Sequence, residues 1–310
     1  MTDDRMEDPT LRDCVIVGGG PAGLTAAIYL ARYHLSVTVL DDGTSRAASI
    51  PVSHNHAGFP GGISGAELLE RMRAQAIMYG ADILDQRATA LRRAEKNFVL
   101  SFSDGAMPAR TVLMATGVVN RMPSMPKTEH DEALKRGLIR YCPVCDGFEV
   151  TDKRVAIIGH GLKAYMEALF LRSYSRNITL LSPSGEHDLE ASEEARLQEL
   201  GILVKSGPLE IEVERDAIVI HTGEGTLQFD SIYPALGSDV RSELASGLGA
   251  RVSEEGCICV DSHQRTSVPG LYAAGDVVIG LDQISHAMGQ AGVAATTIRN
   301  DLCELSALVR

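Results

Sequence analysis

The sequence lacks the features that mark membrane proteins and nucleic-acid-binding proteins. Its 310 residues contain no dense stripe of Lys or Arg and no apolar run long enough for a membrane helix, which needs about 20 residues. The net charge of −12 also argues against nucleic acids and anionic membranes as partners, because both attract basic surfaces. The polar stretch 1–12 lacks the basic and apolar parts of a signal peptide, so we expect a cytoplasmic protein.

Cysteine is too sparse for a structural disulfide framework in a chain of this size. There are six cysteines, and Cys14, Cys257 and Cys259 lie in apolar stretches, where we expect strands with small buried side chains. A metal site would need two such pairs at suitable spacing, or histidines beside them. The sequence offers neither, so we expect no metal site.

Strand-like and helical patterns alternate along the chain, which favours an α/β fold. The apolar stretch 14–17 is followed by a glycine turn and a helical pattern at 24–33, and the same order returns at 155–158, with a helical pattern at 165–174. The simplest interpretation is two Rossmann-like dinucleotide-binding domains.

The second domain is predicted to be inserted into the first. After residue 237 the chain is too short for an independent domain, and it contains a turn, Gly275-Asp276, of the kind that contacts a cofactor. We therefore assign residues 1–118 and 238–310 to the first domain and 119–237 to the second.

The first glycine loop has the pattern and context of a dinucleotide-binding turn. Gly18 allows a tight turn, Gly20 lets backbone amides approach a pyrophosphate, and Gly23 lets the helix pack closely on the strand. The strand 36–40 then ends at Asp41, whose carboxylate can bind ribose hydroxyl groups. The alternative is a glycine turn without a ligand.

Two further turns are predicted to return the chain to the same nucleotide. Thr116-Gly117 follows the apolar strand 111–114, and Asp276 would lie near the ribityl or pyrophosphate part of a flavin. Each of these two motifs is weak on its own.

The motif Cys142-Pro143-Val144-Cys145-Asp146-Gly147 lies between the two glycine loops. Two thiols separated by two residues can close a small disulfide, and a carboxylate directly follows the second thiol. A pair of half-buried structural thiols is the alternative. With the two glycine loops and Ala273-Ala274-Gly275-Asp276-Val277, in this order and spacing, the motif resembles the low-molecular-weight thioredoxin reductases and their relatives.

This resemblance implies a homodimeric FAD enzyme with a redox-active disulfide. Cys145 would be the sulfur nearer the flavin, Cys142 the sulfur that exchanges with substrate, and Asp146 the acid or base. The resemblance also implies rotation between the domains, with hinges near 118–120 and 236–238. The residues implied in FAD binding are Gly18, Gly20, Gly23, Asp41, Asn55, Thr116, Gly117, Asp276, Gln283 and Ile284.

His286 follows the segment that would cap the flavin, and a base there would suit oxidation of a dithiol. The alternative is a histidine at a helix start with no catalytic role. His54 and His56 flank Asn55 and are weaker candidates for a flavin contact.

The second glycine loop departs from the pattern of NADPH-using relatives. His160 and Lys163 make it bulkier, and no arginine follows the strand 177–181 to hold a 2′-phosphate. The acidic side chains there, Glu186, Asp188 and Glu190, would repel one. Three alternatives stay open. NADPH binds weakly, through residues such as Lys163 or Lys205, or NADH binds, or the nucleotide site is vestigial and a dithiol or another carrier donates electrons.

The sequence therefore predicts an FAD-dependent thiol–disulfide oxidoreductase that acts on a thioredoxin-like protein or a small disulfide. NADPH or NADH as the donor is left open. Two alternatives are a dithiol oxidase that uses oxygen, similar to the gliotoxin and holomycin enzymes, and a redox-inactive flavin-binding sensor.

Overall fold

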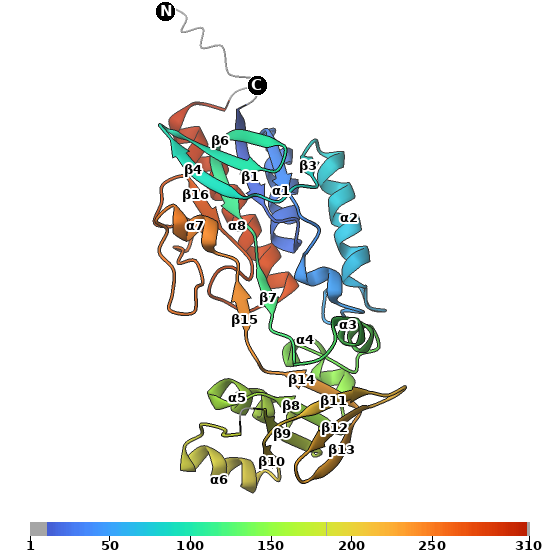
Figure 1. Ribbon diagram of the computed structural model, residues 1–310. Coiled ribbons are helices and arrows are strands. Elements are labelled where there is room, and N and C mark those ends of the chain that lie inside the picture. Colours follow the sequence, from blue (N-terminus) through green and yellow to red (C-terminus); the bar gives the residue numbers. More distant parts are fainter. Residues whose placement is uncertain (1–10, 184, 309–310) are drawn as a thin grey trace, which may run out of the picture. The chain divides into compact units, whose positions relative to one another are not determined.

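The computed structural model describes residues 11–183 and 185–308 (Figure 1). They form two compact units: unit 1 contains 11–48, Gly65–Val119 and 239–308, and unit 2 contains Ser49–Ser64 and Asn120–Ser238 apart from residue 184. The predicted boundaries lie within one residue of the borders at 119 and 238, but Ser49–Ser64, which the prediction places in the first domain, groups with unit 2. That the two units are separate folding domains with these boundaries stays a prediction.

The sheet of unit 1 has seven strands: β1 (Arg12–Val17), β2 (Val37–Leu40), β3 (Asp82–Leu84), β4 (Ala90–Ala94), β5 (Asn97–Phe102), β6 (Gly105–Met114) and β16 (Leu271–Ala273). Their order is β3-β2-β1-β6-β5-β4, and β16 also pairs with β6. The pairs β1–β2, β2–β3, β1–β6 and β16–β6 are parallel, whereas the pairs β4–β5 and β5–β6 are antiparallel.

Both faces of this sheet are buried, because successive side chains of a strand point to opposite faces. From β1, Cys14 and Ile16 belong to one core cluster, and Val15 and Val17 belong to the other. Complete burial of a side chain such as Ile16 stabilises the fold by about 1.5–3 kcal/mol. The strand that carries the first glycine loop is therefore packed against core side chains on both faces.

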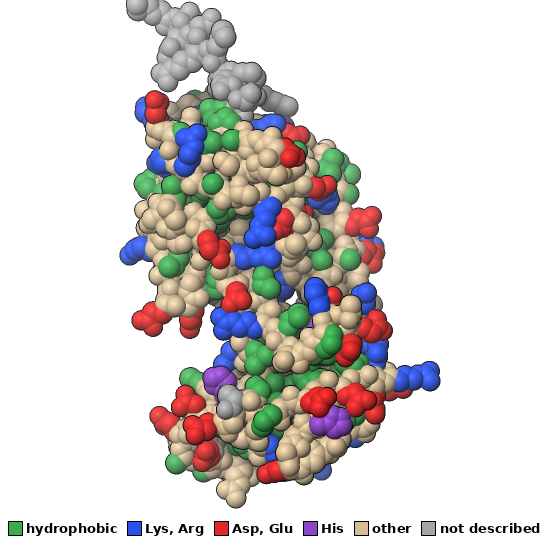
Figure 2. Space-filling model, in the orientation of Figure 1, with side chains coloured by type: hydrophobic (Ala, Val, Ile, Leu, Met, Phe, Trp, Pro, Cys, Tyr) green, Lys and Arg blue, Asp and Glu red, His purple; other side chains and the backbone are tan. Residues whose placement is uncertain are grey.

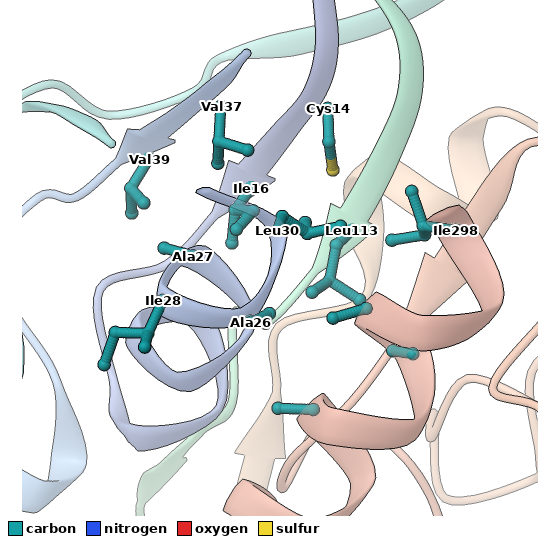
Figure 3. Packing of buried hydrophobic residues seen from close by; sticks show 14 of the residues in the cluster. Cys14, Ile16, Ala26, Ala27, Ile28, Leu30, Val37, Val39, Leu113 and Ile298 are labelled. Carbon is teal, nitrogen blue, oxygen red and sulfur yellow. The ribbon is translucent and has the colours of Figure 1, made fainter. Parts of the chain in front are cut away.

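Helices cover the sheet of unit 1, and their bounds are α1 (Pro21–Arg32), α2 (Gly65–Met78), α7 (Glu243–Gly247) and α8 (Ile284–Leu305), with a 3₁₀ turn η1 (Arg46–Ser49). Helices α1 and α8 contribute to the Cys14 cluster through Leu30 and Ile298 (Figure 3). α1 begins at Pro21, earlier than the pattern at 24–33 predicts, because proline suits the first helical position.

Unit 2 has a four-stranded parallel sheet with the order β10-β9-β8-β14. Its strands are β8 (Val155–Ile158), β9 (Ile178–Ser182), β10 (Leu203–Ser206) and β14 (Ser231–Pro234). A three-stranded antiparallel sheet accompanies it: β11 (Glu210–Val213), β12 (Ile218–Thr222) and β13 (Gly225–Phe229). Ile157 and Tyr233 lie in one core cluster, while Ile158 and Ile232 lie in the other.

The helices of unit 2 are α3 (Lys127–Lys135), α4 (Pro143–Asp146), α5 (Gly161–Leu171) and α6 (Ala191–Glu199), with a 3₁₀ turn η2 (Gly147–Val150). The chain crosses between the units at β7 (Val118–Asn120) and β15 (Ser238–Val240), which pair with each other. Each unit thus has helices and a sheet that is wholly or partly parallel, and the predicted α/β class is confirmed.

None of the helices in the described part of the chain is long and apolar enough to cross a membrane. Figure 2 shows acidic and basic side chains interspersed over the face in view. Cys14 is buried as predicted, but the prediction for Cys257 and Cys259 is wrong: both are only half-buried, and between them Ile258 makes only isolated β-bridges. The segment 1–10, on which the expectation about a leader rests, lies outside the described residues.

Candidate active site

Cys142 and Cys145 form a disulfide in unit 2, with their Cα atoms 5.2 Å apart. Cys142 is extended and caps the short helix α4, which begins at Pro143. The Cys145 N–H points back at the Cys142 Sγ atom at 3.1 Å, and the Asp146 N–H donates to the Cys142 carbonyl at 3.2 Å. The Cys145 amide would stabilise negative charge on the Cys142 sulfur, which favours a thiolate there when the disulfide is reduced.

The Asp146 carboxylate is held from two sides. The Arg140 Nη1 atom donates to Oδ2 at 2.9 Å, and the Tyr233 hydroxyl donates to Oδ1 at 2.8 Å. Burial raises the pKa of Asp146 above its usual value, although the Arg140 cation and the Tyr233 hydrogen bond act in the opposite direction. A carboxyl group with a raised pKa beside a disulfide is suited to proton transfer.

Arg140 and Tyr233 were not anticipated as members of the site. Tyr233 lies in the apolar strand β14, whose sequence predicts a core residue, and it is 87 residues from Asp146. The one available signal is its hydroxyl group, because a buried tyrosine generally needs a hydrogen-bond partner.

A second polar cluster precedes the disulfide. The buried His130 of α3 contacts Asp131 through Nδ1 at 3.0 Å and the Tyr141 hydroxyl through Nε2 at 2.7 Å. A neutral ring with its proton on Nδ1 donates to the carboxylate and accepts from the tyrosine. Tyr141 directly precedes Cys142, so this cluster anchors the chain at the entry to the disulfide turn.

The first glycine loop in unit 1 is shaped by close backbone contacts. A Cβ atom on Gly18, whose φ is +109°, would lie 2.3 Å from the Ala115 carbonyl oxygen, and one on Gly23 would lie 1.9 Å from the Gly18 carbonyl oxygen. Gly20 caps α1, and no side chain caps this helix. The positive φ and close contact at Gly18 are the geometry of a tight turn, and the contact at Gly23 is that of a helix packed closely on the strand.

Asp41 lies against the glycine loop. A Cβ atom on Gly19 would lie 2.2 Å from the Asp41 carboxylate, and the carboxylate also contacts Arg73 at 3.4 Å and the Gly43 N–H at 3.1 Å. Thr116 and Gly117, the turn predicted to return to the same nucleotide, are joined to Arg241. The Thr116 hydroxyl donates to the Arg241 carbonyl at 2.5 Å, and Gly117 has a φ of +64°. The backbone N–H of Arg241 in turn donates to the Gly117 carbonyl at 3.0 Å.

Asp276 is mostly buried in unit 1. Arg46 Nη1 donates to Asp276 at 3.2 Å and to Asp282 at 2.9 Å. Burial and the Asp282 charge raise the pKa of Asp276, and Arg46 lowers it. Arg46 was not anticipated from the sequence, because it lies in η1, away from every motif.

The start of α8 contains three more predicted residues. Gln283 caps this helix, Ile284 is its first residue, and His286 lies in its first turn. A Cβ atom on Gly280 would lie only 2.6 Å from the His286 Nε2 atom. It is buried and has no hydrogen-bond partner among the residues that the structure describes.

Asn55 belongs to unit 2, where its side-chain amide donates to the Val144 carbonyl within the disulfide turn at 3.4 Å. Cys142, Cys145, Asp146 and Asn55 are thus together in unit 2. His286 and the other residues implied in FAD binding, Asp276 among them, lie in unit 1. For the described residues, no group of three or more His, Cys, Asp or Glu side chains could hold a metal ion.

Comparison with known proteins identifies one family. The model of the pyridine nucleotide-disulphide oxidoreductase family matches residues 12–291. The thioredoxin reductase of Mycolicibacterium smegmatis is 33% identical over 87% of this chain and 89% of its own length. That of Peptoclostridium litorale is 31% identical over 95% of this chain and 98% of its own length.

Solved structures agree with these sequence relatives. The thioredoxin reductase from Streptococcus pyogenes has a TM-score of 0.87 at 26% identity, covering 95% of this chain and 99% of that chain. The thioredoxin reductase from Giardia duodenalis has a TM-score of 0.83 at 26% identity, covering 94% of this chain and 99% of that chain.

Proposed function

Since the chain belongs to the pyridine nucleotide-disulphide oxidoreductase family, we propose that Cys142 and Cys145 carry electron pairs between FAD and a thioredoxin-like protein. The chain is a disulfide oxidoreductase resembling thioredoxin reductase, so the predicted family and enzyme class are confirmed. The observation that supports this proposal most directly is the closed Cys142–Cys145 disulfide followed by the constrained carboxylate of Asp146.

The residues of unit 1 fit FAD. Gly20 caps α1, where helix amides favour a pyrophosphate, and Asp41 lies beside that loop, where it suits a ribose. The orphaned His286 Nε2 atom and the half-exposed Gln283 offer polar contacts at the start of α8. The proposed FAD-binding residues remain Gly18, Gly20, Gly23, Asp41, Thr116, Gly117, Asp276, Gln283 and Ile284 of unit 1, together with Asn55 of unit 2. When bound, FAD supplies a two-electron carrier.

The chain's own residues perform the exchange with substrate. In the reduced protein, the Cys142 thiolate attacks one sulfur of a substrate disulfide, and the other substrate sulfur leaves as a thiolate. Cys145 then attacks the mixed disulfide at the Cys142 sulfur, which releases the second substrate sulfur and re-forms the Cys142–Cys145 bond. The substrate gains two electrons and, with two protons, becomes a dithiol.

Asp146 is proposed to hold or deliver the proton that accompanies this exchange, because its pKa is raised and it directly follows Cys145. His286 is proposed as a second acid–base group, on the flavin side. Its unpartnered Nε2 atom supports this role, whereas the alternative remains a structural histidine that packs on Gly280.

We also propose a cytoplasmic homodimer, in keeping with the resemblance. Exposed apolar side chains on α1 and α8 support self-association, since Tyr29 is 43% exposed and Val293 is 41% exposed. Sedimentation analysis of the purified protein tests this part: a monomer at micromolar concentration would contradict it.

Oxidation of a dithiol is the second candidate. In that direction a substrate dithiol reduces the Cys142–Cys145 disulfide, and oxygen is the final electron acceptor. The sequence after β9 favours it, because no Lys or Arg lies between Arg176 and Arg196 to bind a nucleotide phosphate.

The proposed function is tested by following the flavin absorbance of the FAD-loaded protein under anaerobic dithiothreitol. We expect bleaching in the wild type, loss of bleaching in Cys145→Ser, and no change in Cys303→Ser, which alters a free, half-buried cysteine. Bleaching that survives Cys145→Ser would contradict the proposal. A wild-type flavin that stays oxidised would favour the redox-inactive sensor instead.

A further inference from the structure

The two glycine loops of this chain differ in conformation at equivalent positions. Gly20 in unit 1 has a φ of −77° and caps α1. Its counterpart in unit 2, Gly161, has a φ of +67° and is the first residue of α5. The backbone at the second loop is therefore turned differently at the point where a dinucleotide pyrophosphate approaches a glycine loop.

The Gly161 N–H is already used within the chain. It donates to the His187 carbonyl oxygen at 2.6 Å. In the first loop, by contrast, no backbone carbonyl among the described residues accepts the N–H of Gly20. A phosphate at the second loop would have to displace the His187 carbonyl, because one N–H cannot serve both acceptors well.

His187 is fixed by its own side chain. The residue is 8% exposed, and its imidazole Nε2–H donates to the carbonyl of Lys205 in β10 at 2.8 Å. One residue earlier, the Glu186 carbonyl accepts the hydroxyl of Ser182, at the end of β9, at 2.6 Å. Residues 185–190, the 185–190 segment, are thus joined by hydrogen bonds to β9, β10 and the glycine loop.

These attachments lie at the carboxyl ends of parallel strands. β9 ends at Ser182, β10 ends one residue after Lys205, and the loop that contains Gly161 follows β8. The carboxyl edge of a parallel sheet is where dinucleotides bind in this kind of fold. The 185–190 segment therefore lies at the edge of the sheet where this kind of fold binds a nucleotide.

Charge opposes a nucleotide at the same place. Glu186, Asp188 and Glu190 lie on the segment, and each would repel a phosphate. Lys205, one of the two lysines considered as phosphate ligands, is paired with Glu224 at 2.6 Å. The other lysine, Lys163, is exposed in the first turn of α5.

We infer that the 185–190 segment closes the second dinucleotide site, so that neither NADPH nor NADH binds at Gly161. A nicotinamide cofactor, which the family implies, does not fit the residues present at this loop. One consequence rests on the proposed function: electrons enter or leave unit 2 through the Cys142–Cys145 disulfide alone.

Calorimetric titration of the FAD-loaded protein with NADPH and with NADH tests this closure directly. We expect no binding heat up to millimolar nucleotide. A dissociation constant in the micromolar range for either nucleotide would overturn the inference. The measurement does not depend on turnover, so the dithiothreitol experiment described above fails or succeeds independently of it.

Hydrogen exchange tests the hydrogen bond that closes the loop. His187→Gly removes the buried imidazole and its bond to Lys205, and we expect backbone amides in 159–165 to exchange at least tenfold faster. Glu186→Gln, the matched control, removes one charge, keeps His187 and should leave exchange unchanged. Unchanged exchange in His187→Gly would overturn the inference. So would micromolar NADPH binding by Glu186→Gln, because charge alone would then exclude the nucleotide.

Discussion

Arg140 and Asp146 form an ion pair of 2.9 Å beside the disulfide, with their side chains only 17% and 22% exposed. Arg140 also donates through Nε to the Gly137 carbonyl at 3.0 Å, so the guanidinium is fixed on both sides. A fixed cation next to a partly buried carboxylate decides how readily that carboxylate takes up a proton.

Arg140→Met is therefore expected to raise the pKa of Asp146 further, because the cation that opposes the effect of burial is lost. The pH at which dithiothreitol reduction of the disulfide changes rate should move upward. Stability should fall by about 1–3 kcal/mol, since the carboxylate loses a charged hydrogen-bond donor. Stopped-flow reduction rates over a pH series and urea unfolding measure both effects.

Arg154→Met is the matched control, since Arg154 pairs with Asp230, in the same unit but outside the disulfide turn. It should leave the pH profile of disulfide reduction unchanged. An unshifted profile in Arg140→Met itself would show that the ion pair is structural only.

The contact between His130 and Tyr141 predicts an energetic coupling. His130→Phe leaves the Tyr141 hydroxyl without its 2.7 Å partner, and should cost about 1–3 kcal/mol. Tyr141→Phe should cost less, and the double variant should cost less than the sum of the two single variants, with a coupling of about 1 kcal/mol. Urea unfolding of the four proteins gives the cycle. Strict additivity would mean that the hydrogen bond contributes nothing to stability.

The sequence predicted what short-range patterns encode. The spacing of Gly18, Gly20 and Gly23 after an apolar strand led to the β1–turn–α1 unit, because only glycine tolerates the close approach of Gly23 to the Gly18 carbonyl. The two-residue spacing of Cys142 and Cys145 likewise led to the disulfide.

What the sequence did not predict depends on long-range contacts. Tyr233 reaches Asp146 only because β14 joins the parallel sheet next to β8. The closure at Gly161 is made by a backbone carbonyl, which carries no mark of residue type. The missing arginines pointed to the same loop, but the bond from Gly161 to His187 appears only in the folded chain.

Gly23→Ala tests the tight contact in the first glycine loop. Its Cβ atom would lie 1.9 Å from the Gly18 carbonyl oxygen, so the backbone must shift, at a cost of about 1–3 kcal/mol or more. We expect weaker retention of FAD, measured by gel filtration and flavin absorbance. Gly289→Ala in α8 is the control, because its Cβ atom meets nothing within 4 Å. Its FAD content should stay unchanged, and equal losses in both variants would contradict the predicted role of the loop.

Glu167 of α5 predicts a pH-dependent stability that is separate from the disulfide chemistry. Burial raises its pKa to about 7, and the Lys163 charge opposes this only in part. A carboxyl group with a raised pKa favours the folded state at low pH, and this contribution is lost as the pH rises through about 7. Glu167→Gln cannot ionise, so it should gain stability relative to the wild type between pH 5 and pH 8, by roughly 2 kcal/mol. Urea unfolding at both pH values measures this difference. Glu199→Gln, on the exposed side of α6, should show no such change, and a constant offset between wild type and Glu167→Gln would show that Glu167 has an ordinary pKa.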